Sequence, residues 1–256
     1  MKIVVCVKQV ADSEANVLVE GNTITWGESP MVLNPFDEYA VEAALQLKEK
    51  YDAEVIVLSI GEPGETEALK RSLAMGADNA ILISDPLFKA NDQRATASVI
   101  ANAIRKIGDV DIVLFGRQTL DFGSGITPAQ TARILNYPFL GLAGKIEIVE
   151  QKITIDRILE ESKQVVSATA PVIISVVQAI GEPRYPSFMG IRKAAKAEIP
   201  TWSLAEIGGA FPEPTVHSIK YENPPKKSGK CEIITGDTPE EIAKKAIAKV
   251  MAEKVL

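Results

Sequence analysis

Four short apolar runs, separated by stretches with helical periodicity, constrain the fold more than any other feature of this sequence. The runs are rich in β-branched residues and cover residues 2–7, 53–60, 79–84 and 111–116. Continuous apolar runs of this length suit strands that are buried on both faces of a parallel sheet. The stretches between them place apolar residues three and four positions apart, as amphipathic helices do. The sequence therefore predicts an α/β fold with a doubly wound, mostly parallel sheet and right-handed crossovers.

Further strands are expected around this unit. Residues 16–19 and 23–26 alternate about the short turn Glu20-Gly21-Asn22 and predict a hairpin at an edge of the sheet. After the fourth apolar run, residues 144–158 and 162–177 alternate again. They predict antiparallel strands that extend the sheet.

The character of the chain changes after Gly181, where regular patterns are broken by Pro183, Pro186, Pro200, Pro212, Pro214, Pro224 and Pro225. Long irregular segments of this kind are commonly functional or wrapped on a partner. We therefore expect a boundary near Ala179, with an α/β domain over residues 1–179 and an arm over residues 180–256. Thr238, Pro239 and Glu241 form a capping-box pattern that predicts a terminal helix.

Composition narrows the function. The net charge of −6 over 256 residues, without a basic stripe, argues against nucleic-acid binding. Cys6 and Cys231 have no metal-ligand spacing, so we expect no metal site and no disulfide, which fits the cytoplasm. The single histidine, His217, gives little support to a histidine-based catalytic triad. The apolar run at the N-terminus is too short to span a bilayer, so direct membrane insertion is not expected.

A turn of small and polar residues, GRQTLDFGSGIT, follows the fourth apolar run and precedes a helical pattern from about Pro128. Ligands of parallel α/β sheets bind where strands end and helices begin. Glycines in such a turn let backbone N–H groups approach an anion, and the helix N-terminus adds a positive dipole end. The turn thus predicts phosphate binding, although Thr127 as N-cap and Gln130 as its capping-box partner would serve a plain helix cap equally well.

A second candidate loop, LNPFDEY, leads into the first helical stretch. Pro35 fixes an extended approach, and Asp37 is a candidate cap for that helix. A connection without any ligand explains these residues as well. Because both loops lie at the same predicted sheet edge, together they favour a nucleotide site.

The segment EPRYPSFMGIRKAAK combines exposed-looking apolar residues with positive charge. Phe188, Met189 and Ile191 lie between Arg184 and a basic group of Arg192, Lys193 and Lys196. Apolar anchors ringed by charge are typical of partner-docking surfaces. Packing of this segment on the protein's own core is the alternative.

Taken together, the segments VVCVKQV, LNPFDEYAVEAALQLKEK, SLAMGAD, GRQTLDFGSG and EPRYPSFMGIRKAAK resemble the β subunits of electron transfer flavoproteins. The resemblance covers nearly the whole chain. It implies an adenine-nucleotide alpha hydrolase-like fold with a C-terminal arm that wraps a partner. It also implies a heterodimer with an α subunit, FAD held between the two subunits, and electron transfer without a side-chain acid or base.

The resemblance further implies a nucleotide bound within this subunit, AMP in many members and a second FAD, reduced by NADH, in the electron-bifurcating branch. The glycines of the turn would let a pyrophosphate approach the backbone, so we favour FAD over AMP. Phe36 also resembles the aromatic that approaches the shared flavin. The residues that match the family's nucleotide site are Cys6, Asn34, Pro35, Phe36, Asp37, Ile60, Gly116, Arg117, Gln118, Thr119, Leu120, Asp121, Phe122, Gly123, Ser124, Gly125, Ile126 and Thr127.

The partners implied by the resemblance are the α subunit, an acyl-CoA or other dehydrogenase and, in the bifurcating branch, NADH with ferredoxin or a quinone-linked acceptor. Phe188 replaces a leucine anchor of AMP-binding members, which predicts a different partner pocket. The expected docking residues are Arg184, Tyr185, Phe188, Met189, Ile191, Lys193 and Lys196. The alternative function is a non-redox adenine-nucleotide sensor, which would share the sheet but would have no need of the arm.

Overall fold

The computed structural model describes residues 1–21, 23–88, 92–209, 215–216, 219–223, 225 and 231–253. Asn22, Pro212, Pro214, His217 and Pro224 lie outside this part. Contacts between residues divide the chain into two units, Met1–Tyr221 and Glu222–Leu256. Residues 180–221, which we expected in the arm, thus belong to the first unit, and the partner-wrapping role of the arm stays a prediction.

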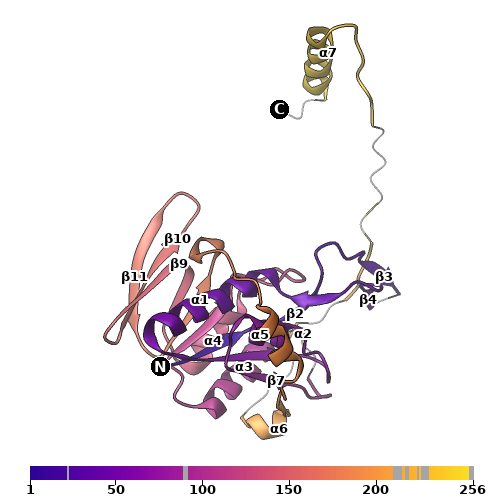
Figure 1. Cartoon of the computed structure of the whole chain (residues 1–256). Helices are drawn as coiled ribbons and strands as arrows, with labels where there is room; N and C mark the ends of the chain where they lie inside the picture. The colour runs from indigo at the N-terminus through magenta and orange to yellow at the C-terminus, as the bar shows by residue number, and fades with distance from the viewer. Residues whose placement is uncertain are drawn as a thin grey trace. The chain divides into compact units, whose positions relative to one another are not determined.

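The described residues of the first unit form a nine-stranded sheet with the order β11-β10-β9-β12-β8-β1-β6-β7-β13. Figure 1 shows β9, β10 and β11 side by side at one edge of this sheet. Neighbouring strands are parallel from β13 to β9, whereas β9, β10 and β11 form an antiparallel meander. This is the predicted doubly wound, mostly parallel sheet. The strands are β1 (Lys2–Cys6), β6 (Glu54–Ile60), β7 (Asn79–Ile83), β8 (Ile112–Gly116), β9 (Phe139–Val149), β10 (Lys152–Ile158), β11 (Lys163–Thr169), β12 (Val172–Val176) and β13 (Thr201–Trp202).

Helices cover both faces of the sheet. Side chains of successive β1 residues point to opposite faces, so Ile3 and Val5 join one core cluster and Val4 and Cys6 the other. The first cluster is closed by α1 (Pro35–Tyr51) and α2 (Glu67–Met75). The second is closed by α3 (Gln93–Ile107), α4 (Thr127–Leu135) and α6 (Leu204–Ile207). The predicted strand and helix positions of the main unit are therefore confirmed.

The direction of β12 corrects one expectation. We expected the strands after the fourth apolar run to be antiparallel, but β12 lies inside the sheet, parallel to both β8 and β9. All five of its residues, VIISV, are buried, as interior parallel strands require. Only the preceding strands form the antiparallel extension.

The crossover from β1 to α1 contains two small sheets. The predicted hairpin is present as β3 (Leu18–Glu20) and β4 (Thr23–Thr25), but it forms a two-stranded sheet of its own and is not an edge of the main sheet. The sequence pattern missed a second pair, β2 (Gln9–Ala11) with β5 (Met31–Leu33). Strands of three residues are too short to show a periodic signal.

The segment after Gly181 is more regular than its prolines indicate. The 3-10 turn η1 (Gln178–Ile180) precedes it, and it contains α5 (Phe188–Ala195), where Ser187 caps the helix by accepting the Gly190 N–H at 2.9 Å. In the second unit, α7 (Pro239–Ala252) begins as predicted, because Thr238 Oγ1 accepts the Glu241 N–H at 3.3 Å. The helices within the described ranges are all too short or too polar to cross a lipid bilayer.

The strand order reverses beside β1. The chain passes from β1 to β6 and β7 in one direction and then returns to β8 on the other side of β1. Ligands of open α/β sheets bind at such a switch point, outside the carboxyl ends of the strands. A ligand site is therefore expected at the carboxyl ends of β1 and β8.

Candidate functional site

A pocket lies at this switch point. Its apolar wall comes from the ends of β1, β6 and β8 and from α3, and its other side is the turn of residues 116–127 with the start of α4. The apolar wall consists of Cys6, Val7, Leu58, Ile60, Ile100 and Phe115. A ligand with a flat, largely apolar ring and a charged group could pack its ring on this apolar wall and place its charged group at the polar turn.

Glycines allow the turn to fold closely over the strand ends. A Cβ atom on Gly116 would lie 2.5 Å from both the Asp37 carboxylate and the Phe36 carbonyl oxygen. A Cβ atom on Gly125 would lie 2.9 Å from the Arg117 carbonyl oxygen, and this glycine also has a φ of +62°. Gly123 has a φ of +63° but open space around its Cα atom. Side chains at residues 116 and 125 would therefore displace the backbone that forms the pocket.

The side chain of Asn34 holds the turn of residues 116–127 in place through two hydrogen bonds. This side chain is fully buried, its Nδ2 donates to the Gln118 carbonyl at 2.9 Å, and its Oδ1 accepts the Leu120 N–H at 3.1 Å. The residue immediately precedes α1, so it links the start of that helix to the turn. Asn34 thus positions the turn without lining the pocket.

Asp37 corrects our expectation of a helix cap. The residue lies within α1, and its carboxylate accepts the backbone N–H of Lys8 at 2.9 Å and of Gly116 at 3.2 Å. It therefore ties α1 to the ends of β1 and β8. Burial raises the pKa of Asp37 to about 7, although the hydrogen bonds that it accepts oppose this rise. Burial, followed by the Asp37 charge, also raises the pKa of the Cys6 thiol.

The expected cap of α4 is also wrong. Thr127 is the first residue of the helix, and the preceding Ile126 makes no side-chain cap. Asn34, which is not part of the turn or of α4, holds the backbone of the turn through its two hydrogen bonds. The start of α4 is therefore fixed without a side-chain cap. The backbone N–H groups of Ser124, Gly125, Ile126 and Thr127 have no acceptor among the residues that the structure describes. Such N–H groups at a helix start are an anion-binding arrangement.

Lys8 adds a charge that the sequence analysis missed. Its ammonium pairs with Asp121, and it lies 4.7 Å from the centre of the Phe122 ring. Asp121 thus neutralises the charge of Lys8. The other cation that lines the pocket, Arg117, is exposed and has no ion pair among the described residues. Recognition of a phosphate here would depend mainly on backbone N–H groups and on Arg117.

The structure brings together eleven of the eighteen predicted nucleotide residues. Those that line the pocket are Cys6, Asp37, Ile60, Gly116, Arg117, Gln118, Thr119, Phe122, Ser124, Gly125 and Thr127. Asn34, Pro35, Phe36, Leu120, Asp121, Gly123 and Ile126 lie outside the lining. Among the residues that sequence reasoning missed, Gln93, Thr96 and Ile100 come from α3. Gln93 and Thr96 belong to the polar first turn of this helix, which was the only signal in the sequence, and only the folded structure shows that the helix reaches the pocket.

The expected docking residues gather on α5 and the segment before it. Tyr185 is 90% exposed, Phe188 73% and Met189 70%, and Ile191 is also exposed. Lys193 and Lys196 lie exposed beside them. Arg184 differs from the others, because its guanidinium pairs with Glu42 and Glu49 of α1. The described fold therefore leaves an apolar surface uncovered at α5 and directs Arg184 inward.

Comparison with known proteins finds relatives that align with most or all of this chain. The family model for the electron transfer flavoprotein domain matches residues 23–207. The caffeyl-CoA reductase-Etf complex subunit CarD of Acetobacterium woodii is 35% identical, and the beta subunit of an electron transfer flavoprotein from Megasphaera elsdenii is 34% identical, each over the whole of both chains. Protein FixA of Azorhizobium caulinodans is 35% identical over 81% of this chain and 77% of its own. The family match spans most of the first unit, and two of these relatives align from end to end, so the chain belongs to the electron transfer flavoprotein family as a beta-type subunit.

Proposed function

We propose that this subunit binds an adenine nucleotide in the switch-point pocket, and that the nucleotide is FAD. The observation that carries the proposal is the row of backbone N–H groups at residues 124–127 without an acceptor in the described chain, beside an apolar wall. A phosphate would accept from these groups at the positive end of α4. The wall of Ile60, Ile100 and Phe115 would cover a ring system.

Two features favour FAD over AMP. Gly125 lines the pocket and places no side chain between the turn and a ligand, so two linked phosphates can lie along the backbone. Arg117 adds a positive charge on the rim, which suits the second charge of a pyrophosphate. AMP remains the alternative nucleotide, since it needs only part of the same surface.

With an α subunit, we propose that the chain also helps to hold a shared FAD and carries electrons between a dehydrogenase and an acceptor. The flavin supplies the redox chemistry, whereas the protein supplies binding, orientation and local charge. Phe36 of this chain would lie against the shared flavin. A second FAD in the pocket would also make the complex a candidate for NADH-driven bifurcation, with ferredoxin or a quinone-linked acceptor. Membership of the family favours this role over a non-redox nucleotide sensor.

The test is to coexpress the chain with its α subunit, release the bound nucleotides with acid, and identify and count them by chromatography. We expect two FAD molecules and no AMP per heterodimer. One FAD with one AMP would overturn the assignment of FAD to this pocket. One FAD with no other nucleotide would overturn nucleotide binding by this subunit.

Paired glycine variants assign the released nucleotide to the pocket. In Gly116→Ala the new Cβ atom would meet backbone and carboxylate atoms at 2.5 Å, so we expect the complex to lose one nucleotide. Gly123→Ala has the matched chemistry in open space and only strains a left-handed backbone, by roughly 1–2 kcal/mol. We expect this control to keep its nucleotide. Equal nucleotide contents in the two variants would contradict the placement.

A further inference from the structure

The docking surface on α5 depends on how the chain reaches that helix. Residues 181–187 connect the end of the sheet to α5 and form no helix or strand. Pro183 and Pro186 remove two backbone donors from this connection, so it has few main-chain bonds with which to hold itself in place. Side chains must therefore fix its path over the rest of the protein.

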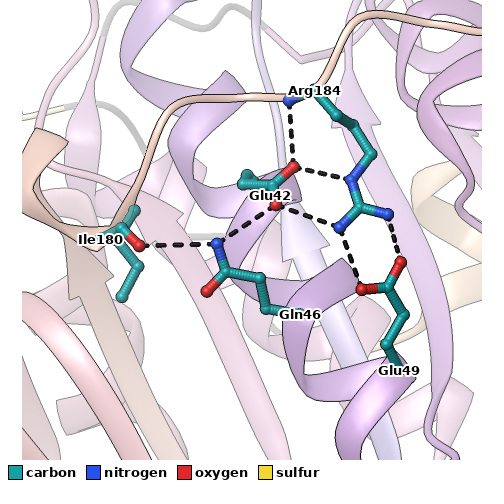
Figure 2. Close-up of polar contacts among 5 residues, drawn as sticks. All are labelled: Glu42, Gln46, Glu49, Ile180 and Arg184. Carbon is teal, nitrogen blue, oxygen red and sulfur yellow. Dashed lines mark hydrogen bonds and ion pairs between the residues drawn. The ribbon is translucent and has the colours of Figure 1, made fainter.

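Arg184 makes the contacts that do so. Figure 2 shows its side chain reaching down to α1 with the guanidinium between Glu42 and Glu49. The Glu42 carboxylate accepts the Arg184 backbone N–H at 3.1 Å, Nε at 2.9 Å and an NH2 group at 3.1 Å. Glu49 accepts from both terminal nitrogens of the same guanidinium. One residue thus fixes both the backbone of the connection and its own side chain.

Glu42 is suited to this role because its side chain is buried and is held by a further hydrogen bond. Its side chain is only 6% exposed, and Gln46 on the next turn of α1 donates to it at 3.2 Å. Burial alone would raise the pKa of Glu42, but the hydrogen bonds from Arg184 bring it below its ordinary value. The same bonds to Glu42 and Glu49 raise the pKa of Arg184. Glu42 therefore stays ionised, and each charge depends on the other.

A second contact fixes the far side of the connection. Gly190 of α5 packs so closely on α2 that a Cβ atom would lie 2.3 Å from the Ala74 carbonyl oxygen. The apolar side chains of Tyr185, Phe188 and Met189 lie between or beside these two attachments and remain exposed. Preorganisation of exposed anchors lowers the ordering cost of docking.

We propose that Arg184 is a positioning residue, which holds the docking segment of residues 183–196 in one conformation through Glu42 and Glu49 and does not itself contact the partner. This inference rests on the proposed docking role of α5. Of the expected docking residues, only Arg184 changes its role, from partner contact to positioning. A partner protein would contact the apolar and basic side chains that Arg184 keeps in place.

The test measures amide hydrogen exchange in the full chain purified with its α subunit. In Arg184→Ala we expect exchange over residues 185–196 to rise about tenfold or more, with less than about a twofold change over residues 116–127. Arg184→Lys should restore only part of the protection, since an ammonium cannot bridge two carboxylates in a planar fork. The matched control is Arg71→Ala, which also removes an arginine ion pair to α1, the pair with Glu38, but none of the contacts that Arg184 makes.

The same variants are then assayed with an acyl-CoA dehydrogenase chosen because it reduces the wild-type complex. We expect Arg184→Ala to raise the KM for that dehydrogenase severalfold at unchanged kcat, and Arg71→Ala to leave both unchanged. Unchanged exchange over residues 185–196 in Arg184→Ala, or a rise spread through the sheet, would overturn the proposal. An unchanged KM beside increased local exchange would overturn the link between positioning and docking. The nucleotide count is measured separately, so loss of the proposed nucleotide function would be recognised as such.

Discussion

Asp37 is the residue at which burial and charge are most directly opposed. Its carboxylate is enclosed at the ends of β1 and β8, and burial raises its pKa from 3.8 to about 7. Between these pH values the folded chain holds a proton that the unfolded chain has released. The free energy of unfolding therefore decreases as the pH rises from about 4 through 7, and the full cost of the buried charge is present above that range.

Replacement of Asp37 by Asn should remove this dependence. Relative to Asp37→Asn, the wild-type chain should lose roughly 2–3 kcal/mol of stability between about pH 5 and about pH 8, as the shift to about 7 implies. The measurement is urea unfolding of both proteins at several pH values. Comparison with the variant cancels the titration of all other groups, so parallel stability curves would contradict the raised pKa. Loss of one accepted N–H bond shifts the variant's curve by a constant and leaves its slope unaffected.

The residues of the site differ in how far the sequence could predict them. The glycines and small residues of the turn were identifiable because backbone approach and left-handed φ angles leave a compositional signal. Asp37 was identified as a helix cap, but the structure uses it between strands that are distant in sequence. Lys8 was missed because its role depends on Asp121, which is 113 positions away. Long-range pairing of polar side chains has no local signal, and this limits prediction at the scale of single residues.

At the scale of elements, Asp92 connects α3 to a distant segment. One carboxylate oxygen caps the helix by accepting the Ala95 N–H at 2.9 Å. The other accepts the Thr215 N–H at 2.7 Å and the Val216 N–H at 3.1 Å. These bonds outweigh the effect of burial and hold the pKa of Asp92 well below its usual range. The first turn of α3 also lines the pocket through Gln93 and Thr96.

Asp92→Ala should therefore affect both stability and the site. Loss of the cap and of the buried charge-assisted bonds should cost about 2–4 kcal/mol in the free energy of unfolding. Movement of the first turn of α3 should lower the nucleotide content of the purified complex. The matched control is Asp85→Ala, which removes the carboxylate that accepts the Leu204 N–H at 3.0 Å but lies outside the pocket lining. Equal nucleotide loss in both variants would show that general destabilisation is the cause.

The elements were predicted best where one physical pattern dominates. The buried strands and amphipathic helices of the main unit were expected at nearly their observed positions, because apolar periodicity alone determines them. The predicted direction of β12 was wrong. The preceding strands alternate and are antiparallel, and the same reading was applied to β12, although its five residues are all buried. In α5, prolines and a glycine masked a short helix that depends on the Ser187 cap and on packing against α2. Tertiary contacts outweigh local propensity in such short elements.

At the scale of the whole molecule, the two units differ in what they bury. Both core clusters lie in Met1–Tyr221, whereas α7 of the second unit has no buried residue within the described chain. Its apolar side chains recur at helical spacing, and Ile247 and Met251 are 63% and 62% exposed. An exposed apolar face of this kind marks a surface that another protein covers. The sequence predicted the helix and its cap, and we propose that a partner subunit covers its apolar face.

A chain that ends at Tyr221 tests this division. The truncated protein should unfold within about 3 °C of the full-length chain, because the arm contributes no residue to either core cluster. It should, however, fail to copurify with the α subunit, since the proposed partner-wrapping surface is gone. The full-length variant Met251→Lys keeps the arm and adds only a charge to the apolar face of α7, so it should weaken the heterodimer at an unchanged unfolding temperature. Retention of the α subunit by the truncated chain would show that the first unit alone holds the partner. A large fall in unfolding temperature would show that the arm contributes to the stability of the first unit.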